Sequence, residues 1–193
     1  SLVSEKPSLD SSGATGTRSA MPHSQTNETK SQDNNILLVD MGVVVDAYCS
    51  DLTRPIFLGK MSRLHKKIFD IVWEAQRAGI RKAAPGVTCA EVDKACRDVI
   101  QKHGYSKFFG HGTGHGVGLE IHEAPNVSGR SDTVLKPGMV ITIEPGIYLP
   151  DRKLGVRIED DILITKSGPE VLTASIPKSI DAVEKAIAEA RAG

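Results

Sequence analysis

The segment 109–125 holds three of the six histidines of the chain within a run of alternating glycines. The histidines are His111, His115 and His122, and a glycine stands at every second position from 110 to 118. Glycine at this density rules out a regular helix and lets backbone and ligands approach each other closely. A histidine in such a segment can turn toward a metal ion or a substrate.

Acidic residues lie within or at the end of three apolar, β-branched runs, a pattern that predicts buried strands. They are Asp40 and Asp51 in 36–54, Glu144 in 137–146 and Glu159 in 155–165. Burying a lone carboxylate costs several kcal/mol, so strands that bring several together need positive charge between them. Two divalent ions would neutralise the four carboxylates. Oxygen ligands with one imidazole and no thiolate favour Mn²⁺ or Co²⁺, with Zn²⁺ or Fe²⁺ as alternatives.

In order and surroundings, these residues resemble the catalytic domain of the pita-bread (M24) metallopeptidases, the family of methionine aminopeptidase, aminopeptidase P and prolidase. The likeness covers about residues 16–175. It implies an α+β fold in which helices cover a curved antiparallel sheet. It also implies five metal ligands, which fall on Asp40, Asp51, His115, Glu144 and Glu159. By the resemblance, Asp51 and Glu159 bridge two metal ions, Asp40 binds one of them, and His115 with Glu144 binds the other.

Two motifs resemble the proline-specific branch of this family, Xaa-Pro aminopeptidase and Xaa-Pro dipeptidase (prolidase). They are Ser-Asp-Leu-Thr-Arg at 50–54 and Gly-Val-Arg-Ile-Glu-Asp at 155–160. The resemblance implies hydrolysis of Xaa-Pro bonds at the N-terminus of peptides or in dipeptides. The accessory histidines of the branch map to His23, His111 and His122, which are implied to contact substrate or the tetrahedral intermediate.

The same resemblance suggests individual roles in hydrolysis. Glu144 would carry a proton to the leaving nitrogen, and His122 would hydrogen-bond the developing oxyanion. Arg157 stands two residues before Glu159, so a strand would project both to one face. There the guanidinium could hold the bridging carboxylates by bidentate hydrogen bonds.

Two alternatives stay open: a peptidase of the methionine aminopeptidase type, and a pita-bread domain that binds a partner without catalysis. Each ligand taken singly also has a structural interpretation, since an acid after a strand can form a turn or a helix cap. The occurrence of all five in family order favours the metal centre. An assay on Xaa-Pro and Met-Xaa peptides would distinguish a proline-specific peptidase from one of the methionine aminopeptidase type.

The sequence departs from the family pattern in two places. The first helices and strand of the family domain are absent or reduced before the segment with His23, so we expect an incomplete domain. Sheet surface left uncovered would be apolar, and we therefore expect a homo-oligomer. In addition, Ala47 stands before Tyr48 where the family more often has glycine, and we expect only a modest adjustment of the backbone.

Composition sets broad limits on class and partners. The 193 residues suit one domain, and a formal net charge of zero suggests neither nucleic acid nor a membrane surface as partner. Three cysteines without a Cys-x-x-Cys motif indicate a reducing compartment, and no signal peptide or membrane-length apolar run is evident. We therefore expect a cytoplasmic protein.

The pattern along the chain divides it at residue 34. Residues 1–34 are polar and predict an irregular arm and a loop that carries His23, whereas 35–193 predict the catalytic domain. Strands are expected in 35–58, with a turn around Gly42, and strands and loops in 109–165. Periodic apolar residues and capping patterns predict helices over 62–83, 89–103 and 179–191.

Overall fold

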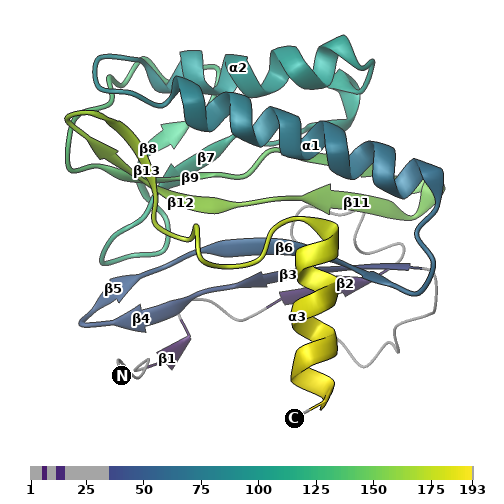
Figure 1. The fold of residues 1–193 in the computed structure, drawn as a ribbon. Helices are drawn as coiled ribbons and strands as arrows, with labels where there is room; N and C mark the ends of the chain where they lie inside the picture. The colour runs from purple at the N-terminus through teal and green to yellow at the C-terminus, as the bar shows by residue number, and fades with distance from the viewer. Residues whose placement is uncertain (1–5, 8–11, 16–34, 193) are drawn as a thin grey trace.

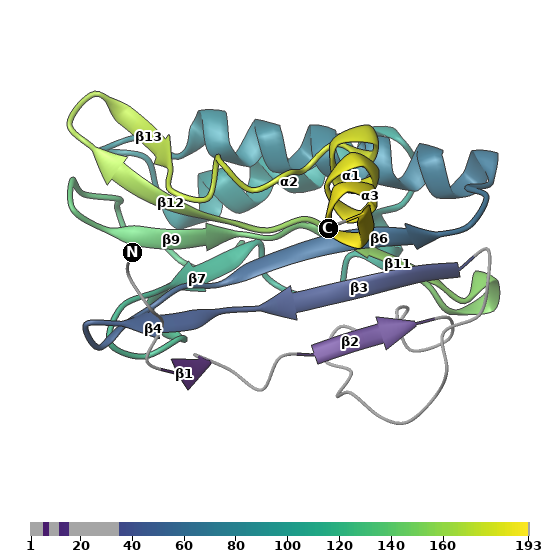
Figure 2. The same ribbon diagram turned by 60° about the horizontal axis from the view of Figure 1, so that its bottom comes forward.

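The computed structural model describes residues 6–7, 12–15 and 35–192. Two long helices lie side by side over one face of an antiparallel sheet, and further strands lie on the side of this sheet away from them (Figures 1 and 2). The helices are α1 (Arg63–Lys82), α2 (Cys89–Lys102) and α3 (Ile180–Ala192), with short 3-10 turns η2 (Ser106–Phe108) and η3 (Pro150–Arg152). None of the described helices is long and apolar enough to cross a membrane.

The sheet beneath the helices has five strands in the order β13-β12-β9-β7-β8, and all their pairings are antiparallel. The strands are β7 (Gly114–Gly116), β8 (Glu123–Val127), β9 (Val140–Ile143), β12 (Asp160–Thr165) and β13 (Gly168–Val171). β10 (Gly146–Leu149) and β11 (Leu154–Arg157) form a separate antiparallel pair.

Two three-stranded sheets complete the architecture, in the orders β2-β3-β6 and β1-β4-β5. Their strands are β1 (Lys6–Pro7), β2 (Ser12–Thr15), β3 (Asn35–Met41), β4 (Val43–Val45), β5 (Tyr48–Cys49) and β6 (Leu52–Leu58). The expected irregular arm is thus corrected where it is described, because β1 pairs with β4 and β2 pairs with β3. Their backbone groups find partners on these edges, a long-range effect that a polar composition does not reveal.

Helices α1 and α2 begin where the sequence predicts. Ser62 accepts a hydrogen bond from the backbone N–H of His65, and Thr88 forms the expected capping box with Glu91. Both helices present apolar faces to the sheet, and they approach each other closely at Gly79, where a Cβ would lie 2.5 Å from Cys96 Sγ. The fully buried residues at this interface include Ile68, Val72, Val92, Ile100, Ile141 and Ile143.

The turn expected around Gly42 lies instead at Asp46 and Ala47, between β4 and β5. Both residues have positive φ, at 49° and 63°. Asp tolerates this left-handed conformation, but Ala carries a Cβ that meets the following carbonyl oxygen. Ala47 therefore adopts, with some strain, a backbone conformation that a glycine would adopt without strain.

Replacing Ala47 with glycine is expected to stabilise the protein by about 0.5–1 kcal/mol, because relief of the left-handed strain exceeds the added entropy of the unfolded chain. Chemical denaturation would measure the gain. Ala188→Gly, at an exposed position of α3, is the matched control and should be destabilising. An Ala47→Gly protein that is less stable than the parent would contradict the interpretation.

Candidate metal centre

His115 and Glu144 are brought together by an unusually close contact between β7 and the end of β9. A Cβ on Gly114 would lie 2.0 Å from the carbonyl oxygen of Thr142, so glycine is required for the two strands to pair here. The N–H of His115 donates to Thr142 Oγ1 at 3.0 Å, and the N–H of Glu144 donates to the Thr113 carbonyl at 2.7 Å. Gly114 therefore allows β7 and β9 to come into contact. The sequence pattern had suggested that the glycines leave room for a ligand.

Asp40, Asp51 and Glu159 come from the strands on the other side of the site. Asp40 lies on β3 opposite Thr53 of β6, and Asp51 directly precedes β6. Glu159 lies in the short connection between β11 and β12, and its backbone N–H donates to the Thr53 carbonyl at 3.2 Å. Backbone pairing thus aligns carboxylates that are more than 100 positions apart in the sequence.

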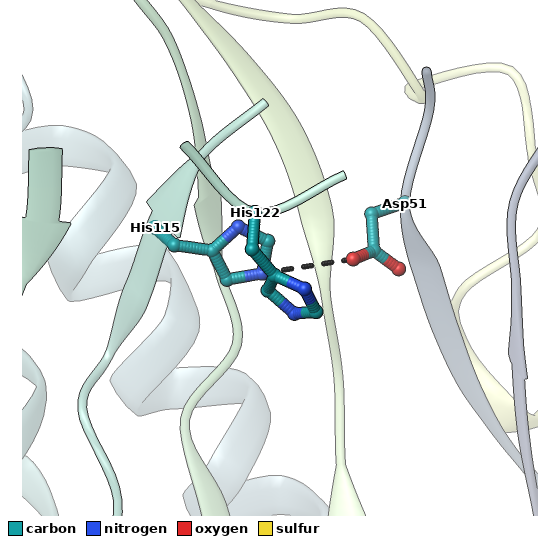
Figure 3. Close-up of side chains that lie close together, drawn as sticks. All are labelled: Asp51, His115 and His122. Atoms are coloured by element: carbon teal, nitrogen blue, oxygen red, sulfur yellow. Dashed lines mark ion pairs between the residues drawn. The ribbon is translucent and has the colours of Figure 1, made fainter. Parts of the chain in front are cut away.

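The imidazole of His115 faces two of these carboxylates. Its Nε2 lies 3.4 Å from Glu144 Oε1 and 3.6 Å from Asp51 Oδ2, the second contact being drawn in Figure 3. Its Nδ1 lies 2.9 Å from the Gly116 carbonyl, which can only accept a hydrogen bond. The proton therefore sits on Nδ1, and the Nε2 lone pair points toward the carboxylates, as a metal-ligating histidine requires.

The potential ligand atoms form two adjacent groups that share Glu159. One group contains His115, Glu144 and Glu159, the other contains Asp40, Asp51 and Glu159, and within each group the atoms lie within 4.8 Å of one another. Asp40 Oδ1 and Asp51 Oδ1 are buried and accept no hydrogen bond from the part of the chain that the structure describes. Buried carboxylate oxygens without donors fit a site for cations, so this donor set suits two divalent ions.

Arg157 places a positive charge among these acids. Its NH2 donates to Asp40 Oδ2 at 2.6 Å, and its Nε donates to Thr53 Oγ1 at 3.0 Å and lies 3.9 Å from Glu159 Oε2. The Thr53 hydroxyl in turn donates to Glu159 Oε2. The expected bidentate contact with bridging carboxylates is therefore corrected: Arg157 binds Asp40 directly and reaches Glu159 through Thr53.

His111 is fixed by protein partners at both ring nitrogens. Its Nδ1 lies 2.7 Å from the Gly112 carbonyl, so Nδ1 carries the proton, and its Nε2 accepts from the Tyr148 hydroxyl at 2.9 Å. The same hydroxyl accepts from Arg157 NH1 at 3.3 Å. In this arrangement Tyr148 links His111 to the arginine that binds Asp40, while a contact of His111 with substrate stays a prediction.

His122 lies beside His115, with ring centroids 4.3 Å apart, and belongs to a third potential ligand group with His115 and Asp51 (Figure 3). It is exposed and lines an open pocket of about 640 Å³. The other residues of the pocket include Leu119, Glu120, Glu123 and Asn126. The remaining expected residue, His23, lies outside the described residues.

Burial, together with repulsion between neighbouring carboxylates, raises the pKa of Asp51, Glu144 and Glu159. Burial, followed by the charges of Asp40 and Glu144, raises the pKa of Asp51 to about 8. Burial raises the pKa of Glu144 to about 7 and that of Glu159 well above its usual value, against the opposing charge of Arg157. Burial lowers the pKa of His115, which favours the neutral ring. A bound cation would stabilise the ionised form of these buried carboxylates, so the electrostatics of the site favour cation binding.

Sequence reasoning missed several residues that support the site. They are Thr53, Thr142, Tyr148 and Asp161. Asp161 accepts from the N–H of Asp51 at 3.0 Å, and burial raises its pKa to about 6. Thr53 stands within the 50–54 motif and Asp161 directly after the 155–160 motif, so position offered a signal for both. For Tyr148 and Thr142 the sequence offered no signal beyond their position near Glu144.

Known proteins resemble this chain in both sequence and fold. Residues 3–166 match the sequence profile of metallopeptidase family M24. The chain is 47% identical over 169 residues to an Xaa-Pro dipeptidase of Pyrococcus horikoshii, covering 88% of this chain and 48% of that protein. It thus spans about half the length of the curated relatives it matches.

Solved structures give the same result at the level of the fold. An Xaa-Pro dipeptidase from Bacillus anthracis superposes with a TM-score of 0.88 at 48% identity, over 92% of this chain and 49% of that one. An X-Pro aminopeptidase from Thermotoga maritima superposes with a TM-score of 0.88 at 39% identity, over 91% and 49%. The expected α+β pita-bread fold, with antiparallel sheets covered by helices, is confirmed. The chain belongs to metallopeptidase family M24.

Proposed function

We propose that this chain forms the catalytic part of a dinuclear metal peptidase that hydrolyses Xaa-Pro bonds. The main support is the convergence of five potential ligands on two adjacent positions, with carboxylate oxygens that lack hydrogen-bond donors within the described residues. In the proposal, Asp40, Asp51, His115, Glu144 and Glu159 hold two divalent ions, of which Mn²⁺ best suits the oxygen-rich donor set. Such ions, when bound, supply an activated water and polarise the scissile carbonyl.

The residues of the chain would divide the remaining work between them. Glu144, whose Oε1 lies 3.4 Å from His115 Nε2, would take up a proton and pass it to the leaving nitrogen. His122, exposed beside His115, is placed to donate a hydrogen bond to the oxyanion that develops on the carbonyl. Arg157 and Thr53 would keep Asp40 and Glu159 oriented through the hydrogen bonds described above.

The Xaa-Pro specificity is inferred from the relatives. Proteins 47% identical to this chain are described as Xaa-Pro dipeptidases, and a structure at 39% identity is that of an X-Pro aminopeptidase. A proline in the second position removes the N–H of the scissile amide, so a site can select it by shape. The open pocket beside His122 offers space for a short peptide.

The test is an assay of the chain with Mn²⁺ on Ala-Pro and Met-Ala peptides. Ala-Pro should be cleaved and Met-Ala left intact, and a chelator should abolish the cleavage. Preference for Met-Ala would replace this function with that of a methionine aminopeptidase. Calorimetric titration with Mn²⁺ gives the independent check, since a chain that binds no ion has no dinuclear site.

We further propose that the chain self-associates and works in a reducing compartment such as the cytoplasm. Met41 and Val43, on β3 and β4, are exposed, and so is Leu119 near the site. Association would remove such apolar side chains from water. Cys49, Cys89 and Cys96 are buried and form no disulfide within the described part of the chain, which suits a reducing environment. Light scattering that shows a monomer at high concentration would refute the self-association.

A further inference from the structure

The carboxylate of Asp93 lies on α2, in the helical layer, and contacts the segment that leads into β7. Asp93 is only 1% exposed. Its Oδ1 accepts a hydrogen bond from the hydroxyl of Thr113 at 2.8 Å. The Thr113 N–H is shared between the Val127 carbonyl at 2.8 Å and Asp93 Oδ1 at 3.2 Å. Thr113 is itself fully buried, so the contact is shielded from water and charge-assisted.

Thr113 connects this carboxylate to two of the proposed metal ligands. It stands two residues before His115, and its carbonyl accepts the N–H of Glu144 at 2.7 Å. The N–H of His115 is held in turn by Thr142 Oγ1, which also donates to Glu144 Oε1 at 3.3 Å. Asp93 therefore anchors the backbone at the point where β7 meets the end of β9.

Arg97, one helical turn after Asp93, holds the beginning of the same glycine-rich segment. Its Nε donates to Asp93 Oδ2 at 2.7 Å. Its NH1 donates to the Phe109 carbonyl at 3.1 Å and its NH2 to the His111 carbonyl at 2.5 Å. The guanidinium also lies 4.3 Å from the centroid of the Phe109 ring, within the range of a cation–π contact. One ion pair on α2 thus binds the segment at residues 109, 111 and 113.

We propose that Asp93 and Arg97 are positioning residues of the metal centre, through which α2 fixes the glycine-rich segment and so the places of His115 and Glu144. Glycines supply few side-chain contacts of their own, so the order of this segment has to come from such anchors. The inference rests on the proposed function for the metal ions, whereas the anchoring itself can be tested without metal.

The variants are Asp93→Ala, which removes the anchor, and Thr113→Val, which removes only the hydroxyl and keeps the ion pair of Asp93 with Arg97. Thr113→Ser restores the hydroxyl and is the conservative rescue. The matched control is Asp98→Ala, because Asp98 pairs with Lys94 at 2.6 Å on the exposed face of the same helix. Should Asp93→Ala fail to fold, Thr113→Val decides the outcome against Thr113→Ser.

The first measurement is amide hydrogen exchange by NMR in the metal-free full chain. The amides of His115 and Glu144 are expected to exchange roughly 10-fold faster or more in Asp93→Ala and Thr113→Val, relative to the amide of Val72 in α1. Normalisation to Val72 separates local release from global destabilisation. The Asp98→Ala and Thr113→Ser proteins should exchange as the parent does. Parent-like exchange at His115 and Glu144 in both anchor variants would overturn the inference.

The second measurement is the binding of Co²⁺, monitored by calorimetry and by the visible absorption of the bound ion. We expect Kd to rise about 10–100-fold and the absorption to change in the two anchor variants, as is typical when residues that orient ligands are lost. Parent-like affinity and absorption in both would overturn the inference. A parent chain that binds no Co²⁺ would instead overturn the proposed function, and the exchange rates would still decide the anchoring.

Discussion

Glu144→Gln is expected to lower kcat for an Xaa-Pro substrate by roughly 1,000-fold while the protein stays folded, because the amide can neither carry a proton nor bind a cation with full charge. The substitution preserves the size of the side chain, and glutamine still accepts a hydrogen bond from Thr142. Steady-state kinetics with saturating Mn²⁺ would measure the loss. We expect the defect mainly in kcat, since Glu144 acts on the leaving nitrogen in the proposed mechanism.

The control for this variant is Glu170→Gln, at an exposed position of β13. It makes the same chemical change outside the site and should leave kcat unaltered. Turnover by Glu144→Gln at the parent rate would remove Glu144 from the mechanism. A thermal melt of each protein would establish that the loss is not one of folding.

The second large effect is a steep rise of metal affinity with pH. The pKa of Asp51 is raised to about 8 and that of Glu144 to about 7, so the metal-free site holds protons at pH 6 that a cation must displace. Each displaced proton changes the apparent affinity about 10-fold per pH unit, so displacement of both gives up to about 100-fold per unit below pH 7. Burial lowers the pKa of His115, so this ring contributes less to the pH dependence than the carboxylates do.

Calorimetry in two buffers of different ionisation enthalpy, at pH 6 and pH 8, would count the protons released. The raised pKa values also predict how the stability of the metal-free protein depends on pH. A carboxyl with a raised pKa in the folded state binds more protons there than when unfolded, so the metal-free protein should lose stability as pH rises from about 4 to 8. Equal affinity at the two pH values, with no proton release, would contradict the electrostatic account of the site.

Local sequence patterns were sufficient for the helices and for the selection of candidate ligands. Thr88 with Glu91 caps α2 as expected, because a capping box depends on residues three positions apart, and α1 begins directly after Ser62, as the periodic pattern predicts. The ligand residues could be selected because acids inside apolar strands and histidines among glycines are locally conspicuous. For the described candidates, the structure brings Asp40, Asp51, His115, Glu144 and Glu159 together, while their roles as ligands stay a prediction.

Local patterns were misleading where partners lie far away in the sequence. The polar segment before residue 34 contributes β1 and β2, whose strand character comes from pairing with β3 and β4. The turn at Asp46 and Ala47 was missed because Ala gives no sign of a left-handed conformation. The alternating glycines suggest room for a ligand, whereas the space beside Gly114 is filled by the backbone of β9.

The sequence by itself determined the chemistry available to this protein: hard oxygen ligands, one imidazole, and a family resemblance carried by short motifs. Only the tertiary structure decided how that chemistry is held. Arg157 meets Asp40 across 117 positions, Tyr148 joins His111 to Arg157, and Asp93 reaches Thr113 from another layer. Such contacts depend on the pairing of strands and the packing of helices, and residue spacing along the chain carries no record of them.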